Sequence, residues 1–260
     1  MELDYLGDKI YYTTAGSGPA VVFLHGFLES VEMWDETIPH FIKSNTVICI
    51  DVPGHGKSDL QNQNTPELSF FSDCVKAVLV ELNIKKSSIV GHSMGGYIGL
   101  VFAKEFPEII ENLILINSTC LPDNEERYAN RDRAVNVISK NFSLFVTEAI
   151  PYLFSKSSKE KHKSKIVRIK TFAHKTSVKG AIYGSLAMKK RVNMITVAEK
   201  LGDKFSILFG EEDNIIEKDQ RVYHVDRLSH AYIETIPNGH MSFIEEFEKT
   251  ITFLKTAMQE

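Results

Sequence analysis

Residues 91–96 read Gly91-His92-Ser93-Met94-Gly95-Gly96, a pattern that predicts a sharp turn from a strand into a helix. It follows the short apolar run Ser88-Ile89-Val90 and opens a helix-like segment, Gly95–Lys104. Such a sharp turn from strand to helix strains the backbone of Ser93 and exposes its hydroxyl above a sheet. Glycine stands two residues before and two after the serine, where a side chain would collide with the turn. An ordinary glycine-rich turn is the alternative, but the strand and helix flanks favour a nucleophile elbow.

Two backbone amides are candidates for binding negative charge that develops on a carbonyl oxygen beside Ser93. The amide of Met94 stands at the start of the predicted helix and points toward that position. A second loop, His25-Gly26-Phe27, ends the first long apolar strand, and its glycine lets the chain turn close to the nucleophile. The amide of Phe27 is therefore the second candidate donor. The same three residues also fit a simple strand-ending turn.

Composition excludes several classes of protein. The chain has 260 residues, of which 43% are hydrophobic and 25% charged, which argues against disorder and against a membrane protein. No apolar run approaches the roughly 20 residues that span a bilayer. The N-terminus lacks the layout of a signal peptide, and a net charge of −4 gives no footprint for nucleic acid. The three cysteines, Cys49, Cys74 and Cys120, have no paired or metal-like spacing and favour core thiols in a reducing, cytoplasmic protein.

Apolar runs of strand length alternate with helix-like segments along the chain. The runs are Val21–Leu24, Val47–Ile50, Ile89–Val90, Leu113–Ile116, Ile207–Phe209 and Tyr232–Ile236, preceded by a hairpin signal at Leu3–Tyr5 and Ile10–Thr13. Several are continuous, as expected of strands buried on both faces of a parallel sheet. Thr65-Pro66 predicts one helix start, and Ser242 with Glu245 predicts a capping box at another. The pattern predicts a doubly wound α/β sheet with ligands at the carboxyl ends of its strands.

Residues 120–195 interrupt this alternation, because they contain helix-like stretches and no clear strand. The segment is too long for a loop, so we expect a helical lid inserted into a core of residues 1–119 and 196–260. Within it, Ser155–Lys175 carries eight Lys and Arg residues and the single acid Glu160. This stretch is either a funnel for an anionic substrate or, as we favour, a solvated outer face of the lid.

A serine nucleophile needs a base, and the base needs an orienting acid. Of nine histidines, His240 follows the last predicted strand and precedes the C-terminal helix, at the edge of the sheet where a base can reach Ser93. The acid is expected between Ser93 and His240 in the chain. Three carboxylates, Glu211, Glu212 and Asp213, compete directly after the strand at 205–209.

Five motifs together resemble the α/β-hydrolase superfamily, across essentially the whole chain outside the lid. They are His25-Gly26-Phe27, Asp51–Asp59, Gly91–Gly96, Gly210–Asp213 and Gly239-His240. The resemblance implies an eight-stranded core sheet, a lid after the sixth strand and the triad Ser93–Asp213–His240. It places the acid three residues beyond Gly210, which selects Asp213, and it gives His55 a structural role in its loop. Some relatives place their acid at the position of Asn117, whose amide cannot serve as a charged partner.

The nucleophile sorts the chemistry within the superfamily. Haloalkane dehalogenases and epoxide hydrolases use aspartate at the position of Ser93, so this chain departs from both. Ester or thioester hydrolysis, carbon–carbon bond hydrolysis, perhydrolysis and a lyase branch remain. The early lid, with Arg127, Arg131 and Arg133, is similar to the arginine-bearing segment of the menaquinone-pathway lyase 2-succinyl-6-hydroxy-2,4-cyclohexadiene-1-carboxylate synthase. We favour the alternative that these arginines pair with Glu125, Glu126 and Asp132 on an exposed helix.

The sequence therefore predicts a serine hydrolase that cleaves a small carboxylic ester without cofactor or metal. The expected site comprises Ser93, Asp213 and His240 with the amides of Phe27 and Met94. The partner is a small-molecule substrate, with no nucleic acid and no membrane, and the oligomeric state stays open. The lyase or a carbon–carbon bond hydrolase is the first alternative. A non-catalytic, hydrolase-like binding protein is the second, although such proteins typically lack a triad member.

Overall fold

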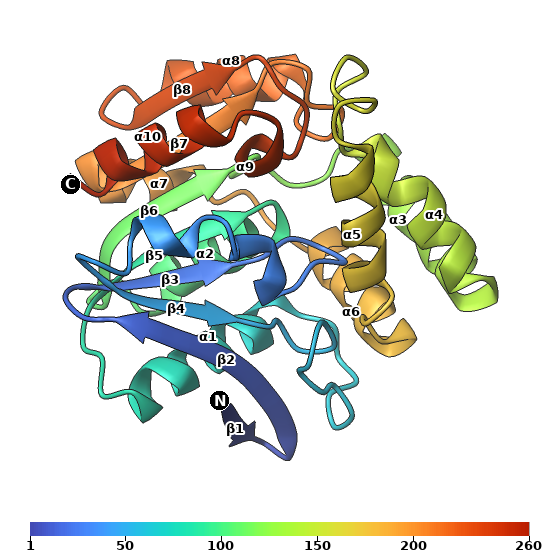
Figure 1. Ribbon diagram of the computed structural model, residues 1–260, viewed down its shortest axis with the longest axis horizontal. Coiled ribbons are helices and arrows are strands. Elements are labelled where there is room, and N and C mark those ends of the chain that lie inside the picture. Colours follow the sequence, from blue (N-terminus) through green and yellow to red (C-terminus); the bar gives the residue numbers. More distant parts are fainter. Residues whose placement is uncertain (260) are drawn as a thin grey trace.

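Eight strands form one sheet in the order β1-β2-β4-β3-β5-β6-β7-β8 (Figure 1). The computed structural model describes residues 1–259. The strands are β1 (Glu2–Tyr5), β2 (Asp8–Gly16), β3 (Ala20–Leu24), β4 (Thr46–Ile50), β5 (Ser87–His92), β6 (Ile110–Ile116), β7 (Phe205–Gly210) and β8 (Tyr232–Ile236). β1 and β2 form the expected antiparallel hairpin, and β2 is antiparallel to β4. All other neighbours are parallel, which confirms the predicted α/β architecture.

Helices cover both faces of the sheet. They are α1 (Leu68–Glu81), α2 (Met94–Glu105), α3 (Glu125–Lys140), α4 (Phe142–Tyr152), α5 (Lys163–Ala173), α6 (Val178–Lys189), α7 (Ile195–Leu201), α8 (Lys218–Arg227), α9 (Ser242–Glu245) and α10 (Phe247–Ala257), with short 3₁₀ turns η1 (Val31–Trp34), η2 (Ile38–His40) and η3 (Gly202–Lys204). No helix among residues 1–259 is both long and apolar enough to cross a membrane.

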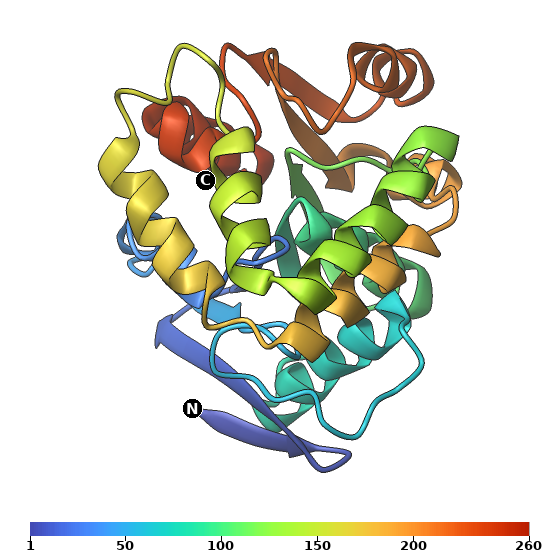
Figure 2. The same ribbon diagram turned by 90° about the vertical axis from the view of Figure 1, so that its right-hand side faces the viewer.

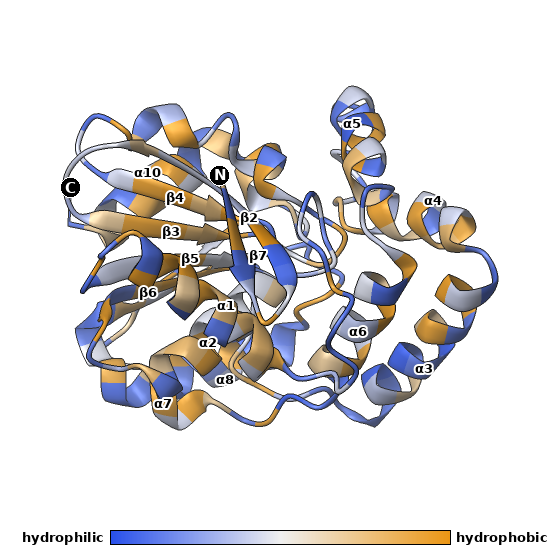
Figure 3. Cartoon of the chain, turned by 90° about the horizontal axis from the view of Figure 1, so that it is seen from below, coloured by the Kyte–Doolittle hydropathy of each residue, from blue (hydrophilic) through white to orange (hydrophobic). Residues whose placement is uncertain are grey.

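Strand β3 shows why the central strands read as continuous apolar runs. Its Val22 and Leu24 pack into a cluster with α1, α2 and α7, whereas Val21 and Phe23 pack into a second cluster with η1 and α10. Both faces of the strand are thus removed from water, so no polar alternation is needed. Figure 3 shows β3, β4 and β5 largely in hydrophobic colours, between helices that carry hydrophilic outer faces. The three cysteines are free and buried, as expected of core thiols.

Four helices, α3–α6, lie between β6 and α7 and gather at one end of the sheet (Figures 1 and 2). We call them the cap helices. Asn124 and Asn141 cap α3 and α4 with their side-chain oxygens, which accept from the amides of Arg127 and Leu144. The division into a core of residues 1–119 and 196–260 and a lid of residues 120–195 stays a prediction.

The basic stretch Ser155–Lys175 meets an acidic part of the core. Its cations form four ion pairs across this junction: Lys165 with Glu36, Arg168 with both Asp35 and Glu36, and Lys175 with Glu32. The expectation of a solvated outer face is therefore only partly met, because these three side chains join α5 and the turn after it to the η1 segment. These acids are more than 120 residues away in the sequence, so the local charge pattern could not predict the pairs.

Neither predicted N-terminal cap forms, although a helix does begin at Ser242 as expected. α1 begins at Leu68 after the extended Glu67, with no side-chain cap, and not at Thr65-Pro66. Ser242 and Glu245 do not form a capping box with each other. Ser242 Oγ accepts from Asn238, and Glu245 accepts from the amides of Gly239 and Met241 in the preceding loop and of the distant Ser155. The predicted C-terminal helix also breaks at Glu246, which separates α9 from α10.

Candidate active site

Ser93 occupies the turn between β5 and α2 in a strained conformation. Its φ of 49° and ψ of −113° lie outside the regions that a serine ordinarily adopts. A Cβ atom at Gly91 would collide with the backbone of Gly95, and one at Gly95 would collide with the carbonyl oxygen of Leu24 at the end of β3. Both glycines are therefore required for α2 to start this close to the sheet, as the sequence predicts.

His240 and Asp213 lie beside Ser93. His240 Nε2 is 2.9 Å from Ser93 Oγ, and His240 Nδ1 is 2.8 Å from Asp213 Oδ2 and 3.0 Å from Oδ1. The three side chains come from loops that follow β5, β7 and β8, all at the carboxyl edge of the sheet. The structure thus brings the three residues that the sequence proposes as nucleophile, base and acid into one hydrogen-bonded line, in that order.

Asp213 is held as a carboxylate. Its Oδ1 accepts from the amides of Ile215 and Ile216 at 2.7 and 3.0 Å. Burial raises the pKa of Asp213, but the adjacent His240 and these hydrogen bonds outweigh burial and hold the pKa below its usual value. The competing acids Glu211 and Glu212 are exposed.

Asn117 has a role that sequence reasoning missed. Its backbone, with φ of 46°, turns the chain at the end of β6. The side-chain amide donates to Asp213 Oδ2 and to the carbonyl of Gly239, both at 3.1 Å, while its oxygen accepts from the amide of Ser242 at 3.2 Å. One amide thus connects the acid with the loop that carries His240. The signal in the sequence was the position of Asn117 at the end of a strand. We considered this position only as a possible site for the acid, for which an asparagine is unsuitable.

The backbone N–H groups of Phe27 and Met94 have no acceptor among residues 1–259. Phe27 lines the cavity at Ser93, and Met94 is the first residue of α2. The neighbouring Gly26 amide points elsewhere, since it donates to Glu29 Oε2 at 2.7 Å. Both candidate donors therefore keep their N–H groups available for a ligand.

The loop of residues 51–59 contains a buried histidine that does not face the triad. The ring of His55 packs against those of His25 and Phe27, and its Nδ1 lies 3.3 Å from the carbonyl of Pro53. Burial lowers the pKa of His55 to about 3, so the ring is neutral. These contacts agree with the structural role that the resemblance implies for it.

A cavity of about 90 Å³ opens at Ser93 and His240. Its other walls come from the loop after β3, from α2 and from the cap helices, with side chains Phe27, Leu28, Tyr97, Arg131, Ile150, Leu153, Met188 and Ile215 among them. Most of these are apolar. The arginine, glutamate and histidine side chains on the wall, besides His240, are Arg131 of α3, Glu29 and His92. The cavity suits a small, largely apolar group next to the serine hydroxyl.

The three cap arginines do not have the predicted partners. Arg131 Nε bonds Asp123 at 3.0 Å, Arg127 Nε bonds Glu217 at 3.2 Å, and Arg133 bonds Asn130. Asp123 is almost completely buried and also binds Arg191 at 2.7 Å, so one carboxylate serves two guanidinium groups. The local pairing that the sequence favours is therefore wrong for all three.

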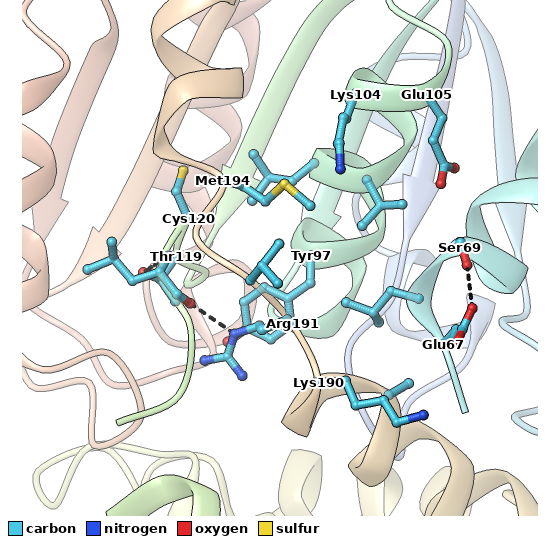
Figure 4. A pocket seen from close by; sticks show the side chains of 16 residues that line it. Glu67, Ser69, Tyr97, Lys104, Glu105, Thr119, Cys120, Lys190, Arg191 and Met194 are labelled. Carbon is cyan, nitrogen blue, oxygen red and sulfur yellow. Dashed lines mark hydrogen bonds between the residues drawn. The ribbon is translucent and has the colours of Figure 1, made fainter. Parts of the chain in front are cut away.

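A second, larger cavity of about 370 Å³ lies beside the first and shares Tyr97 with it. Figure 4 shows Arg191 beside the Tyr97 ring, and its guanidinium lies 4.3 Å from the ring centroid. Charges of both signs line it, from Glu67 and Glu105 to Lys104 and Lys190. Neither Ser93 nor His240 lines this larger cavity, whereas both line the smaller one. No cluster of His, Cys, Asp and Glu among residues 1–259 could hold a metal ion.

Comparison with known proteins identifies the fold family. A family model described as alpha/beta hydrolase fold matches residues 19–247. A serine hydrolase-like protein of Homo sapiens is 34% identical over 102 residues, which are 39% of this chain and 50% of that protein. A soluble epoxide hydrolase of a Corynebacterium is 31% identical over 111 residues, or 43% of this chain and 38% of that protein. The match to an uncharacterized Mycobacterium tuberculosis protein, 33% identical over 112 residues, covers 43% of this chain and only about a third of that relative.

Solved structures match over nearly the whole length. An esterase from Thermogutta terrifontis superposes with a TM-score of 0.90 at 22% identity, covering 99% of this chain and 96% of that one. An enol-lactonase from Burkholderia xenovorans gives a TM-score of 0.90 at 19% identity, with full coverage of both chains. At these identities the likeness shows the fold alone.

Proposed function

Since the chain belongs to the α/β-hydrolase fold family, we propose that it is a serine hydrolase that cleaves a small carboxylic ester. The observation that carries this proposal is the continuous hydrogen-bonded line from Ser93 Oγ through His240 to Asp213. An aspartate nucleophile, as in epoxide hydrolases, is absent from the elbow, where this chain has serine. Catalysis is therefore assigned to Ser93, His240 and Asp213.

The reaction proceeds in two steps, formation of an acyl-enzyme and its hydrolysis by water. Ser93 Oγ attacks the acyl carbon while His240 Nε2 takes the hydroxyl proton, and Asp213 fixes the imidazole and stabilises its positive form. The amides of Phe27 and Met94 bind the oxyanion. When the tetrahedral intermediate collapses, the carbon–oxygen bond to the alcohol breaks and His240 protonates that alcohol. Water then attacks the acyl-enzyme, with His240 again taking and returning the proton, which releases the acid and free Ser93.

The cap helices are assigned the part of a lid over this reaction. Arg131 of α3, Ile150 of α4 and Leu153 at its end line the cavity opposite the elbow, so these segments enclose the substrate. Such enclosure removes water from the reacting atoms and strengthens the electrostatic contacts. The small cavity favours a short acyl group over a long chain. The buried, free cysteines fit the reducing cytoplasm as its location.

A fluorophosphonate probe tests the assignment of the nucleophile. Ser93 is expected to be the labelled residue in peptide mass mapping, and Ser93→Ala is expected to lose at least about a thousandfold in kcat on p-nitrophenyl esters of short acyl chains. Ser88→Ala is the matched control, since Ser88 lies on the same strand and bonds Asn112 rather than the triad. Labelling at another residue, or unchanged turnover by Ser93→Ala, contradicts the proposal.

One observation favours a second candidate, the menaquinone-pathway lyase named above. Arg131 places a positive charge on the wall of the cavity that holds Ser93 and His240. A substrate that carries carboxylates needs such a partner, whereas a neutral ester does not. The lyase would use the same Ser93 and His240 to remove a proton from its substrate.

A further inference from the structure

A buried acid–histidine pair that the triad does not include joins two parts of the site. Glu29 Oε2 accepts from the Gly26 amide at 2.7 Å and lies 3.0 Å from His92 Nδ1. On the other side of the ring, His92 Nε2 lies 2.8 Å from the backbone carbonyl oxygen of His240. Both side chains of the pair are only 1% exposed. The contacts therefore run from the loop of Phe27 to the backbone of His240.

The geometry fixes the charge of the imidazole. Its two nitrogens face a carboxylate oxygen and a carbonyl oxygen, which only accept hydrogen bonds. Nε2 must carry a proton, and with Glu29 ionised, as its lowered pKa and the bond from the Gly26 amide favour, Nδ1 carries one as well. His92 is then an imidazolium and Glu29 its counter-ion. Burial lowers the pKa of His92, but Glu29 outweighs burial and leaves it above its usual value. Burial raises the pKa of Glu29, and His92 and the Gly26 amide bring it below its usual value.

We propose that Glu29 and His92 are positioning residues that hold the Gly26-Phe27 loop and the backbone of His240 in one charged network. The Glu29 oxygen orients the Gly26 peptide, and the neighbouring Phe27 amide is a proposed oxyanion donor. The His92 Nε2–H bond holds the carbonyl of His240, whose ring takes the proton from Ser93. The inference rests on the proposed function, because it assigns both residues through the groups that they orient.

Two other titratable side chains and two rings lie around the Glu29–His92 pair. His25 at the start of the Gly26 loop and Asp213 after β7 act on the pair through their charges, and the His240 ring lies 5.1 Å from the His92 ring. The Phe243 ring of α9 closes the remaining side at 4.9 Å. Glu29 is therefore the only acid that bonds the His92 ring directly among residues 1–259. When His92 loses one of its two ring protons, the nitrogen that lost it becomes a hydrogen-bond acceptor and still faces an acceptor oxygen, so that contact is lost.

Glu29→Gln removes the charge and keeps the contacts, since the glutamine oxygen can accept from both Gly26 and His92. In ¹⁵N spectra of the histidine rings, wild-type His92 is expected to have two protonated nitrogens at neutral pH, and the variant is expected to lose one proton about one pH unit or more lower. At pH values where His92 is neutral in the variant but still charged in the wild type, the kcat of the variant is expected to be about tenfold lower than that of the wild type. Its KM is expected to stay within about twofold. Glu32→Gln is the matched control, because Glu32 lies on the same segment and pairs with Lys175.

The two measurements keep this inference distinct from the proposed function. If Ser93 is not labelled by fluorophosphonate and no ester is turned over, the proposed function fails, while the spectra still report whether His92 is charged. A wild-type His92 with a single ring proton at neutral pH overturns the inference. The inference is also overturned if His92 of the Glu29→Gln enzyme loses its proton at a lower pH than in the wild type while kcat keeps the wild-type pH profile. A shift in both the spectra and the kcat profile, absent from Glu32→Gln, supports it.

Discussion

Asp213 differs from its two acidic neighbours in every contact that matters for a triad. Its oxygens accept from two backbone amides, from Asn117 and from His240, whereas Glu211 and Glu212 point to solvent. Each of these bonds is stronger for a charged acceptor than for a neutral one. The carboxylate is thus fixed in place before the substrate arrives.

Replacement of Asp213 by Asn is expected to leave the fold intact and reduce kcat by about 10⁴-fold, because the amide no longer favours the productive tautomer of His240. Circular dichroism checks the fold, and ester turnover checks the rate. Glu211→Gln and Glu212→Gln serve as controls and are expected to stay close to wild type. If Glu212→Gln is the crippling change and Asp213→Asn is mild, the acid has been assigned one residue too late.

The sequence could predict the residues that belong to short motifs but not those that act through distant contacts. Ser93 and His240 are marked by glycines and by strand ends within a few residues of them. Glu29 carries no such mark, since its partner His92 is 63 residues away and the contact exists only once β3 and β5 are paired. Asn117 is similar, because it meets Asp213 across 96 residues.

Helix α3 carries two arginines four residues apart, which place their side chains on the same face of a helix. Their surroundings still differ. Arg131 lines the reaction cavity and shares Asp123 with Arg191, whereas Arg127 reaches Glu217, just before α8. The packing of α3 against α4 and α6, which separates the two environments, is not encoded in the local charge pattern.

Arg131→Met tests the esterase against the lyase, with Arg127→Met as its matched control. If the protein is an esterase, Arg131→Met is expected to change kcat/KM on a neutral p-nitrophenyl ester by less than about tenfold, or about 1.4 kcal/mol, within what repacking of the cap helices causes. Wild type is expected to turn over the menaquinone intermediate poorly. Efficient conversion of that dianion, lost in Arg131→Met and kept in Arg127→Met, would instead establish the lyase.

Element type was easier to predict than element boundaries. The strands buried on both faces gave unmistakable apolar runs, and the cap helices were recognised by the lack of any such run. Helix starts were less predictable because polar side chains have competing partners. Glu245, for example, accepts from the amide of Met241 just before α9 and also from the amides of Gly239 and Ser155, so its carboxylate is shared with other segments.

The sheet with its covering layers encloses several histidines that the unfolded chain exposes to water. Burial holds the pKa of His55 at about 3, and the pKa values of His25 and His224 are also below the usual 6.5. Below pH 6.5 the unfolded chain therefore binds more protons than the folded one. Acid must favour unfolding over the interval between the usual and the lowered pKa values.

The free energy of unfolding is expected to fall as the pH decreases from about 6.5 toward 3, with His55 alone contributing about 1.4 kcal/mol per pH unit. Urea titrations at a series of pH values measure this slope. His55→Gln is expected to be less stable near neutral pH but to show a shallower slope, because one titrating ring has been removed. Equal slopes for the two proteins contradict a neutral, buried His55.

The loops after β5, β7 and β8 give the molecule a property that none of its segments has alone. Ser93 and His240 are 147 residues apart, and they meet only when the last strand has joined the sheet. A nascent chain that has already formed the elbow carries a nucleophile without a base. Under the proposed mechanism, a chain truncated before β8 has no base beside Ser93 and is expected to leave esters uncleaved.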